Sequence, residues 1–341
     1  MSRILFVLVA VIFVPSVGRA GSVESHTIVS RALSENRVDL DPARRIRVYL
    51  PDSYRNSDRR YPVLYYIPFG QQMLDHPNSI NLFDSAIAGG RIGEFILVTG
   101  DFSTPHTINF FGNNTVTGHW LDFIKRELVT YIDHHYRTLT SASSRGICGH
   151  FLGGYAALKL AMLHPETFNS VYALHPVATD TGERSMLWIP NWQEIHAAKT
   201  YADLQAPYSN PFVAMAQAHL PNPKRPPFYA NFIVEKDGDE LLPNTEHFHQ
   251  LNQNFLLADL TPRYRSNLKA LRAIGFDWGR NDYNQAHVYG ARKYVVALED
   301  YGLRPEAVEH SGDGWDYDFS DYGHINMRML PFFARYLEFG E

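Results

Sequence analysis

A stretch in the middle of the chain, from Arg145 to His164, has the residue types of a turn that presents a nucleophile. It is predicted to form a buried strand, a tight turn and a helix. The turn residues Gly149 and Gly153 let strand and helix approach closely, and serine is the usual residue at the tip of such a G-x-S-x-G turn. Here the tip is Phe151, which has no lone pair and no acidic proton. The sequence predicts the shape of a nucleophile turn without its first chemical step.

Other reactive side chains lie near this turn. Cys148 is the only cysteine, so it can form no disulfide within the chain. A displaced nucleophile is conceivable there, but a small buried hydrophobe is the favoured interpretation because Cys148 precedes the turn in a strand. His175 ends the next apolar strand, so its side chain could reach a cleft above the sheet.

Metal and cofactor sites are not predicted. Two close histidine pairs, His134–His135 and His247–His249, lack further acidic or histidine partners at ligand spacing. Solvated helix faces explain them better.

The loops that follow the predicted parallel strands are rich in aromatic residues. Ligands of open α/β sheets bind at these carboxyl ends. The aromatic residues there are Phe69, Phe102, Phe151, Trp278, Tyr283, Trp315 and Tyr317, and four acids accompany them, Asp282, Asp313, Asp316 and Asp318. Aromatic faces beside carboxylates suit a sugar ring, a phenolic or an extended apolar molecule. Core or lid packing is the alternative role for some of these aromatics.

Alternating strands and helices must position these groups. Strands are predicted over two opening antiparallel runs and five apolar runs, and helices over three amphipathic segments besides the one after the turn. The predicted strands are 27–33, 45–50, 62–67, 95–99, 170–174, 273–277 and 305–310, and the helices are 120–135, 286–301 and 324–337. This order argues for one mostly parallel sheet covered on both faces. The proline-rich stretch 177–271 is predicted to be a lid-like insertion over the sheet's upper edge.

Six segments resemble, in order, the esterase D-like family of the α/β-hydrolase fold, which includes feruloyl esterases, siderophore esterases and mycolyltransferases. They are RVYLPDSY, YPVLYYIPFG, YIDHHYRT, ICGHFLGGYAALKLAMLHPETF, FDWGRNDYN and YGH. The resemblance covers most of 45–176 and 273–337, without the insertion. It implies an α/β-hydrolase fold and a carboxylic ester hydrolase or acyl transferase activity.

The resemblance also assigns roles to positions. The family's serine falls on Phe151, its acid on Asp282, and its histidine on His324, in the chain order that the fold uses. His324 would be a general base oriented by Asp282. Asp237 and Asp239 compete for the acid position, but Asp282 is preferred because a helix and His324 follow it at the expected distance.

The resemblance and the aromatic loops together give the substrate-binding candidates. The family's oxyanion loop usually carries His-Gly, and here it is Phe69-Gly70. The predicted substrate-binding residues are Phe69, Gly70, Phe102, Leu152, His175, Trp278, Tyr283 and Trp315.

Residues 1–20 have the features of a signal peptide. Arg3 precedes an apolar run that is too short to span a membrane comfortably, and small residues follow at the cleavage site. A secreted or periplasmic location without a stable membrane anchor is therefore predicted. The net charge of −5 and the absence of a basic tract argue against nucleic acid as a partner. A small molecule is the expected ligand.

Three functions stay open on the sequence. The first is an ester hydrolase or acyl transferase that works without the usual serine. The second is a cofactor-free lyase, isomerase or cyclase that uses proton transfer. The third is a pseudoenzyme that binds a ligand without turning it over, because fold alone does not decide function.

Overall fold

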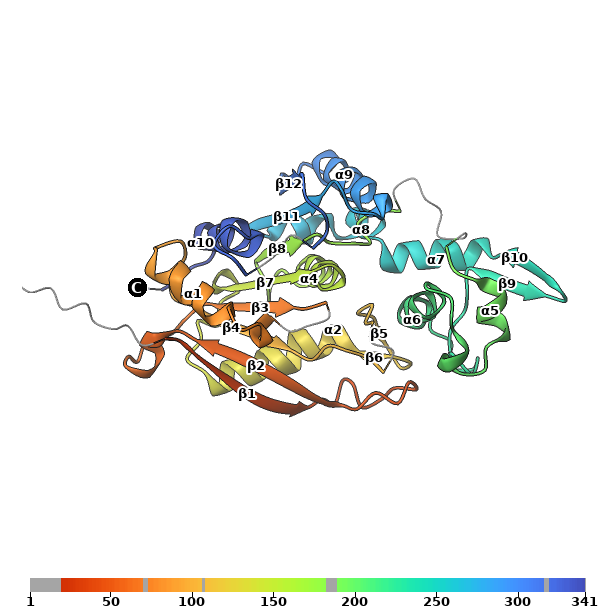
Figure 1. Ribbon diagram of the computed structural model, residues 1–341, viewed down its shortest axis with the longest axis horizontal. Coiled ribbons are helices and arrows are strands. Elements are labelled where there is room, and N and C mark those ends of the chain that lie inside the picture. The colour runs from red at the N-terminus through yellow and green to blue at the C-terminus, as the bar shows by residue number, and fades with distance from the viewer. Residues whose placement is uncertain (1–19, 70–72, 106–107, 182–188, 316–318, 341) are drawn as a thin grey trace, which may run out of the picture.

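The computed structural model describes residues 20–69, 73–105, 108–181, 189–315 and 319–340 (Figure 1). The predicted signal peptide therefore lies almost wholly outside the described residues. Among the residues described, no helix is both long enough and apolar enough to cross a bilayer.

An eight-stranded sheet forms the centre of the molecule. Its order is β1 (Ser22–Val29), β2 (Ala43–Leu50), β4 (Ile96–Gly100), β3 (Val63–Ile67), β7 (Arg145–His150), β8 (Ser170–Leu174), β11 (Ala273–Gly279) and β12 (Glu306–His310). The pairs β1–β2 and β2–β4 are antiparallel, and every later pair is parallel. The predicted α/β-hydrolase architecture is confirmed. The first strand begins five residues and ends four residues earlier than predicted, because residues 22–29 form the pairing with β2.

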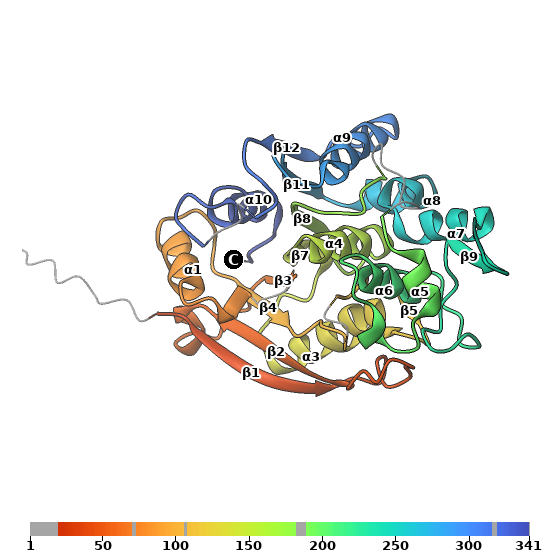
Figure 2. The same cartoon turned by 45° about the vertical axis from the view of Figure 1, so that its right-hand side comes forward.

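Helices cover both faces of this sheet (Figure 2). One face packs against α1 (Ser79–Ala88) and against the π-helical turn Ile325–Met329 that leads into α10 (Leu330–Tyr336). The other face packs against a continuous helix made of α2 (Trp120–Asp122), the π-helical turn Phe123–Leu128 and α3 (Val129–His135), and against α4 (Leu152–Leu163), α8 (Leu257–Ala270) and α9 (Gln285–Asp300). The central strands β3, β4, β7 and β8 are buried on both faces, as their continuous apolar runs predicted, whereas the edge strand β12 is only partly buried.

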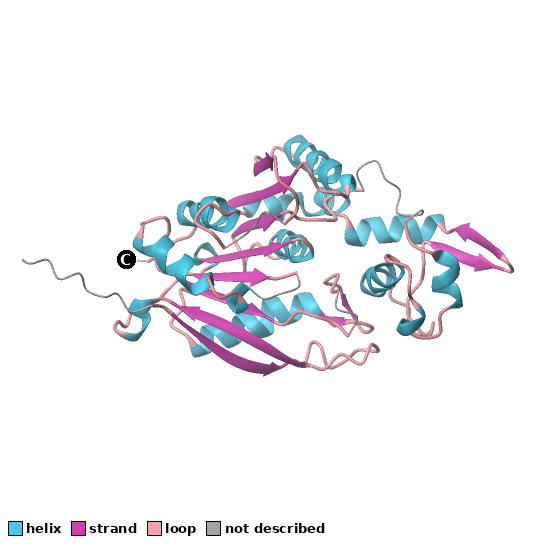
Figure 3. Ribbon diagram, viewed as in Figure 1, coloured by secondary structure: helices cyan, strands magenta, loops and turns pink. Residues whose placement is uncertain are grey.

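In the segment between β8 and β11, the described elements that precede α8 lie beyond the carboxyl ends of the parallel strands (Figure 3). Before its last helix, α8, the segment contains α5 (Trp192–Ala197), α6 (Ser209–His219), the hairpin β9 (Val234–Asp237) with β10 (Glu240–Pro243), and α7 (Thr245–Phe255). A second small hairpin, β5 (Asn113–Asn114) with β6 (Gly118–His119), lies earlier in the chain.

A buried lysine ties this segment to the helix after the turn. Lys159 on α4 is 6% exposed, and its Nζ donates to the Tyr155 hydroxyl at 2.8 Å and to the Asn254 carbonyl of α7 at 2.9 Å. Burial lowers the pKa of the Lys159 ammonium to about 7. The contact therefore holds a titratable group where water cannot stabilise its charge.

Replacing this lysine should change how stability depends on pH. Between pH 7 and roughly pH 10 the unfolded chain keeps a proton that the folded Lys159 has lost, so this group makes the free energy of unfolding rise with pH. We expect the free energy of unfolding of the unaltered protein, minus that of Lys159→Met, to increase by about 1 kcal/mol per pH unit from pH 7 to 9. Urea unfolding at several pH values measures it. Lys269→Met, at an exposed site on α8, is the control; parallel curves for Lys159→Met and the unaltered protein would contradict the assignment.

Candidate functional site

The turn after β7 has the predicted geometry. Phe151 stands between β7 and α4 with φ 55° and ψ −117°, a conformation that side chains rarely adopt. A Cβ at Gly153 would lie 2.0 Å from the Ile67 carbonyl oxygen, and one at Gly149 would lie 2.4 Å from the Gly153 oxygen. Because neither backbone atom can yield cheaply, both positions require glycine. The prediction that Phe151 tips a strand–turn–helix elbow is confirmed.

Three side chains meet behind Phe151. The Asp282 carboxylate, 4% exposed, accepts at Oδ2 from His175 Nε2 at 2.7 Å and from His287 Nδ1 at 2.8 Å. Its Oδ1 accepts from the Asn284 backbone N–H at 2.8 Å. The His287 ring lies 5.3 Å from the Phe151 ring, centroid to centroid, and the His175 ring lies parallel to Phe151 at 6.3 Å. An acid–histidine pair therefore does border the elbow tip.

The predicted pairing of Asp282 with His324 is wrong. His324 Nδ1 lies 3.4 Å from Asp277 Oδ2, and the His310 ring packs edge-on against the His324 ring, with 4.1 Å between centroids. The reason is the alternation of β11, which directs Asp277 toward α10, where His324 begins the last helical segment. Asp282 lies three residues beyond β11 and is already bound by the other two histidines.

The two competing acids, Asp237 and Asp239, lie in a hairpin away from the elbow. Asp237 ends β9, and Asp239 follows in the turn of the exposed β9–β10 hairpin. Preferring Asp282 over these two as the acid near the elbow agrees with its position, although its histidine partner is a different one.

His287 is the residue that sequence reasoning missed. It is the third residue of α9, and Asn284 is the N-cap of that helix, with its side-chain oxygen accepting from the Ala286 N–H. A side chain at this third position commonly folds back toward the N-cap, which brings His287 onto Asp282. The spacing Asp282-x-Asn284-x-x-His287 was the available signal.

Hydrogen bonds fix the protons of both histidines. His175 Nδ1 accepts from the Gly279 N–H at 3.1 Å, so this ring carries its proton on Nε2 and donates it to Asp282. The Asn284 amide lies 2.9 Å from His287 Nε2 and donates to it, so Nδ1 carries the proton shared with Asp282. Burial alone would raise the pKa of the Asp282 carboxyl, but the hydrogen bonds from His175 and His287 hold it well below its usual range.

These protons also bear on metal binding. The donor atoms of His175, Asp282 and His287 lie close enough together to surround an ion, as do those of Asp277, His310 and His324. In each set one histidine nitrogen accepts a backbone N–H, from Gly279 or from Gly312, which leaves the proton on the other nitrogen. A neutral ring in that state has no lone pair left for a metal unless the backbone bond breaks. In each cluster, one of the two histidine rings is therefore already committed to a backbone hydrogen bond.

A cavity of about 300 Å³ opens between the elbow and the segment 177–271. Its polar lining includes Asp180, Thr181, Asn284 and His287. Its apolar lining comes from the loops after β3 and β8, the loop before β5, the elbow, α6 and the end of α7. It includes Phe69, Ile108, Phe110, Phe151, Leu152, Val177, Ile189, Phe212, Met215, Phe255 and Leu256. We call it the main cavity.

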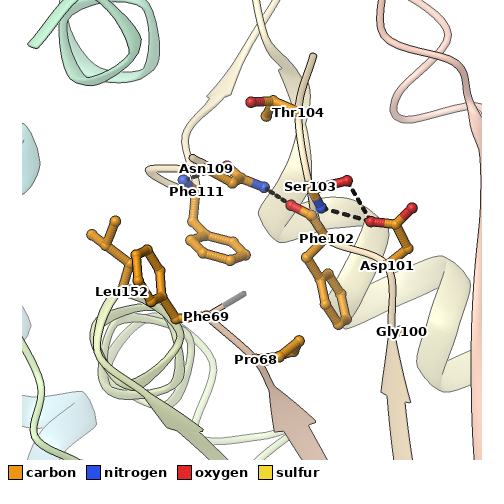
Figure 4. Close-up of a pocket in the computed structure, with 10 residues that line it drawn as sticks. All are labelled: Pro68, Phe69, Gly100, Asp101, Phe102, Ser103, Thr104, Asn109, Phe111 and Leu152. Carbon is orange, nitrogen blue, oxygen red and sulfur yellow. Dashed lines mark hydrogen bonds between the residues drawn. The ribbon is translucent and has the colours of Figure 1, made fainter. Parts of the chain in front are cut away.

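A second cavity, of about 260 Å³, lies beside the first and is called the side pocket (Figure 4). Phe69 and Leu152 line both. Its other walls are Phe102 and Phe111 and a polar rim in which Asp101 Oδ1 accepts from the Ser103 N–H at 2.9 Å. The two cavities therefore flank the side chains next to the elbow tip.

The predicted binding residues separate into several groups. Phe69, Phe151, Leu152 and Tyr283 line the main cavity, with Tyr283 78% exposed. Phe102 lines the side pocket, and His175 lies behind Phe151. Gly70 lies outside the described residues, as do Asp316, Tyr317 and Asp318.

The two predicted tryptophans have different surroundings. Trp315 is 48% exposed, and its ring stacks on Phe151 at 5.6 Å. Trp278 is 5% exposed and packs beside Phe276, and its Nε1 donates to Glu309 of β12. Trp278 is therefore a core residue and its assignment to the binding site is wrong, because the alternation of β11 turns it toward α9.

Comparison with known proteins now identifies the family. The family model described as "Putative esterase" matches residues 39–252, which is more than half of the chain. The chain belongs to this esterase family. The predicted resemblance is thereby confirmed, and the match also includes most of the segment 177–271, which the motifs alone had left out.

Individual relatives of this esterase-family protein match it over shorter stretches. An esterase of Mycobacterium tuberculosis is 30% identical over 120 residues, which are 34% of this chain and 25% of that protein. The uncharacterized protein YbbA of Bacillus subtilis is 25% identical over 139 residues, 38% of this chain and 54% of that protein. The chain thus matches only a quarter to about a half of the length of these relatives.

Solved structures share the fold over nearly the whole chain. A ferulic acid esterase has a TM-score of 0.62 at 16% identity and covers 93% of this chain and 98% of its own. An S-formylglutathione hydrolase from Agrobacterium tumefaciens has a TM-score of 0.55 at 14% identity, with 94% and 96% covered. At these identities the likeness is one of fold.

Proposed function

We propose that this protein is an exported, cofactor-free member of the esterase family that binds an apolar or aromatic small molecule in the main cavity and transfers protons to and from it through His287. No acyl intermediate forms at residue 151. The observation that carries the proposal is the hydrogen bond from His287 to the buried Asp282, on a ring that lines the cavity and lies 5.3 Å from Phe151.

The roles follow from the positions of the groups. Asp282 fixes the His287 ring and stabilises the positive charge that forms when Nε2 takes a proton. The apolar walls exclude water from the bound molecule, which strengthens the interaction of that charge with Asp282. Lyase and isomerase steps need only such a base and a shaped cavity.

A second function is favoured by a separate observation. His287 Nε2 already accepts from the Asn284 amide at 2.9 Å, which would have to turn away before this nitrogen could accept a proton. A protein that keeps this contact binds its ligand without turning it over. Phe151 at the elbow tip and the hydrogen bond that occupies His287 Nε2 would then both be features of a pseudoenzyme.

The ligand retained by protein purified from its native host decides between them. The released molecule is returned to the unaltered protein, to His287→Gln and to His324→Gln in deuterated, ¹⁸O-labelled water. We expect deuterium in the molecule with the unaltered protein and with His324→Gln, and none with His287→Gln. Incorporation of ¹⁸O would indicate ester hydrolysis by activated water. An unchanged molecule in all three samples would leave ligand binding as the function.

A further inference from the structure

The buried Lys159 lies directly behind one wall of the main cavity. Its Nζ donates to the backbone carbonyl of Asn254 at 2.9 Å, and the next two residues of the chain, Phe255 and Leu256, line that cavity. We propose that Lys159 is a pH-dependent switch of ligand binding: neutral Lys159 holds this end of α7 in place, and proton uptake by Lys159 releases it. The effect on the ligand rests on the proposed function, which places the ligand in the main cavity.

The hydrogen-bond acceptors around Lys159 suit its neutral form. A neutral lysine amine has two N–H groups, and the Tyr155 hydroxyl at 2.8 Å and the Asn254 carbonyl accept both. The ammonium form has a third N–H, and no third acceptor contacts Nζ in the part of the chain that the structure describes. Proton uptake therefore places a charge and an unpaired donor at a site that is 6% exposed. Movement of α7 away from α4 relieves both by admitting water.

The titratable groups that face Lys159 belong to α4 and α6. Burial lowers the pKa of the His219 ring on α6 well below its usual value, and the charge of Lys159 lowers it further. Each of these two groups therefore disfavours the charged form of the other. The Tyr155 ring centroid on α4 lies 5.2 Å from Nζ and attracts a cation weakly. Burial outweighs this attraction, because it lowers the pKa of Lys159 to about 7.

Aromatic packing connects Lys159 to the cavity wall. The Phe255 ring lies 5.1 Å from the Tyr155 ring, 4.8 Å from the His219 ring and 5.7 Å from the Phe110 ring, centroid to centroid. The Asn254 amide also donates to the His219 carbonyl at 3.0 Å, which joins α7 to α6. Phe110 and Phe255 both line the main cavity. A shift of Asn254 away from Lys159 therefore moves a wall that an apolar ligand would contact.

Ligand binding and proton release from Lys159 are linked by this geometry. A ligand that packs on the ordered wall binds the neutral form of Lys159 more tightly than the charged form. Its affinity therefore rises as the pH increases through the Lys159 pKa of about 7. By the same linkage, a ligand that binds below this pH displaces the proton from Lys159 into solution.

An uncharged fluorescent probe, N-phenyl-1-naphthylamine, tests the switch. We expect the unaltered protein and the exposed control Lys269→Met to bind it about tenfold more tightly at about pH 8.5 than at about pH 5.5. Lys159→Met has a side chain of similar length that takes up no proton, so it should bind the probe equally at both values. Phe212→Ala alters the lining and should weaken binding at both values, which reports that the probe occupies the main cavity.

Hydrogen exchange tests the wall without a ligand. After correction for intrinsic rates, the backbone amides of 252–256 should exchange about tenfold faster at about pH 5.5 than at about pH 8.5 in the unaltered protein, and equally in Lys159→Met. Lys159→Gln takes its place if circular dichroism shows that Lys159→Met does not fold. Equal pH dependence of binding and exchange in the variant and the unaltered protein would overturn the switch and leave a ligand-binding cavity. Exchange that depends on Lys159, with no binding of the probe at either pH, would contradict the proposed function and confirm only the movement of α7.

Discussion

Phe151→Ser should gain covalent labelling by a fluorophosphonate, which the unaltered protein does not take up at residue 151. The variant should also hydrolyse 4-nitrophenyl acetate about 10²-fold faster than the unaltered protein, a typical gain from a positioned general base. Phenylalanine has no atom that attacks a carbonyl, whereas a serine at the tip would face the ring of His287.

The physical reason is that a hydrogen-bonded acid and histidine, Asp282 and His287, border the elbow tip. Asp282 holds His287 through Nδ1, which leaves Nε2 as the nitrogen that could take a serine proton. The Asn284 amide now occupies that nitrogen at 2.9 Å, so the gain should be larger in Phe151→Ser combined with Asn284→Ala. Loss of the ring also leaves a cavity, so the fold of each variant is verified by circular dichroism.

Three control variants make this result specific. Phe151→Ala removes the ring without adding a hydroxyl and should not be labelled. Adding His287→Ala to Phe151→Ser should abolish labelling, whereas adding His324→Ala should not, because His324 contacts Asp277 instead. Labelling that depends on His324 would show that His324 is the base, as the family resemblance predicted. A folded Phe151→Ser that stays unlabelled would mean that His287 does not serve the elbow tip.

Gly153→Ala should cost the fold about 3 kcal/mol or more, the range of severe overpacking. The new methyl group would stand 2.0 Å from the carbonyl oxygen of Ile67, the last residue of β3. That oxygen is backbone in a buried central strand, so relief requires moving β3 away from α4. Urea unfolding followed by tryptophan fluorescence measures the loss.

The adjacent glycine is a matched control. A Cβ at Gly154 would meet its nearest atom, the Gly149 oxygen, at 3.2 Å, and alanine favours helix over glycine by about 1 kcal/mol. Gly154→Ala should therefore be close to neutral. Equal stability of the two variants would show that α4 and β3 are not held at this distance.

The sheet and the elbow were predictable because local patterns specify them. Continuous apolar runs such as 62–67 are typical of strands buried on both faces, and Gly149 with Gly153 indicates that β7 and α4 approach closely. Both features depend on neighbours in sequence or on backbone contacts. Both can be predicted without knowing which way each side chain points.

The acid–histidine pairing was not predictable by the same means. Choosing between His287 and His324 requires knowing which face of β11 each side chain approaches. Asp277 and Trp278 point to opposite faces, but which residue points to which face follows only from the register of the strand. Motif order favoured His324, whereas the capping geometry of α9 brings His287 to Asp282. Trp278 was wrongly predicted to line the binding site for the same reason, because the register of β11 was not known.

The elbow tip has a consequence at the level of the gene. Every phenylalanine codon becomes a serine codon by a change of its second base, so serine at position 151 is one point mutation away. The strained turn, its glycines and the Asp282–His287 pair would all be in place when that mutation occurs. Any large population that carries this gene therefore samples the serine allele repeatedly. The frequency at which that allele persists would measure selection for or against a nucleophile in the living cell.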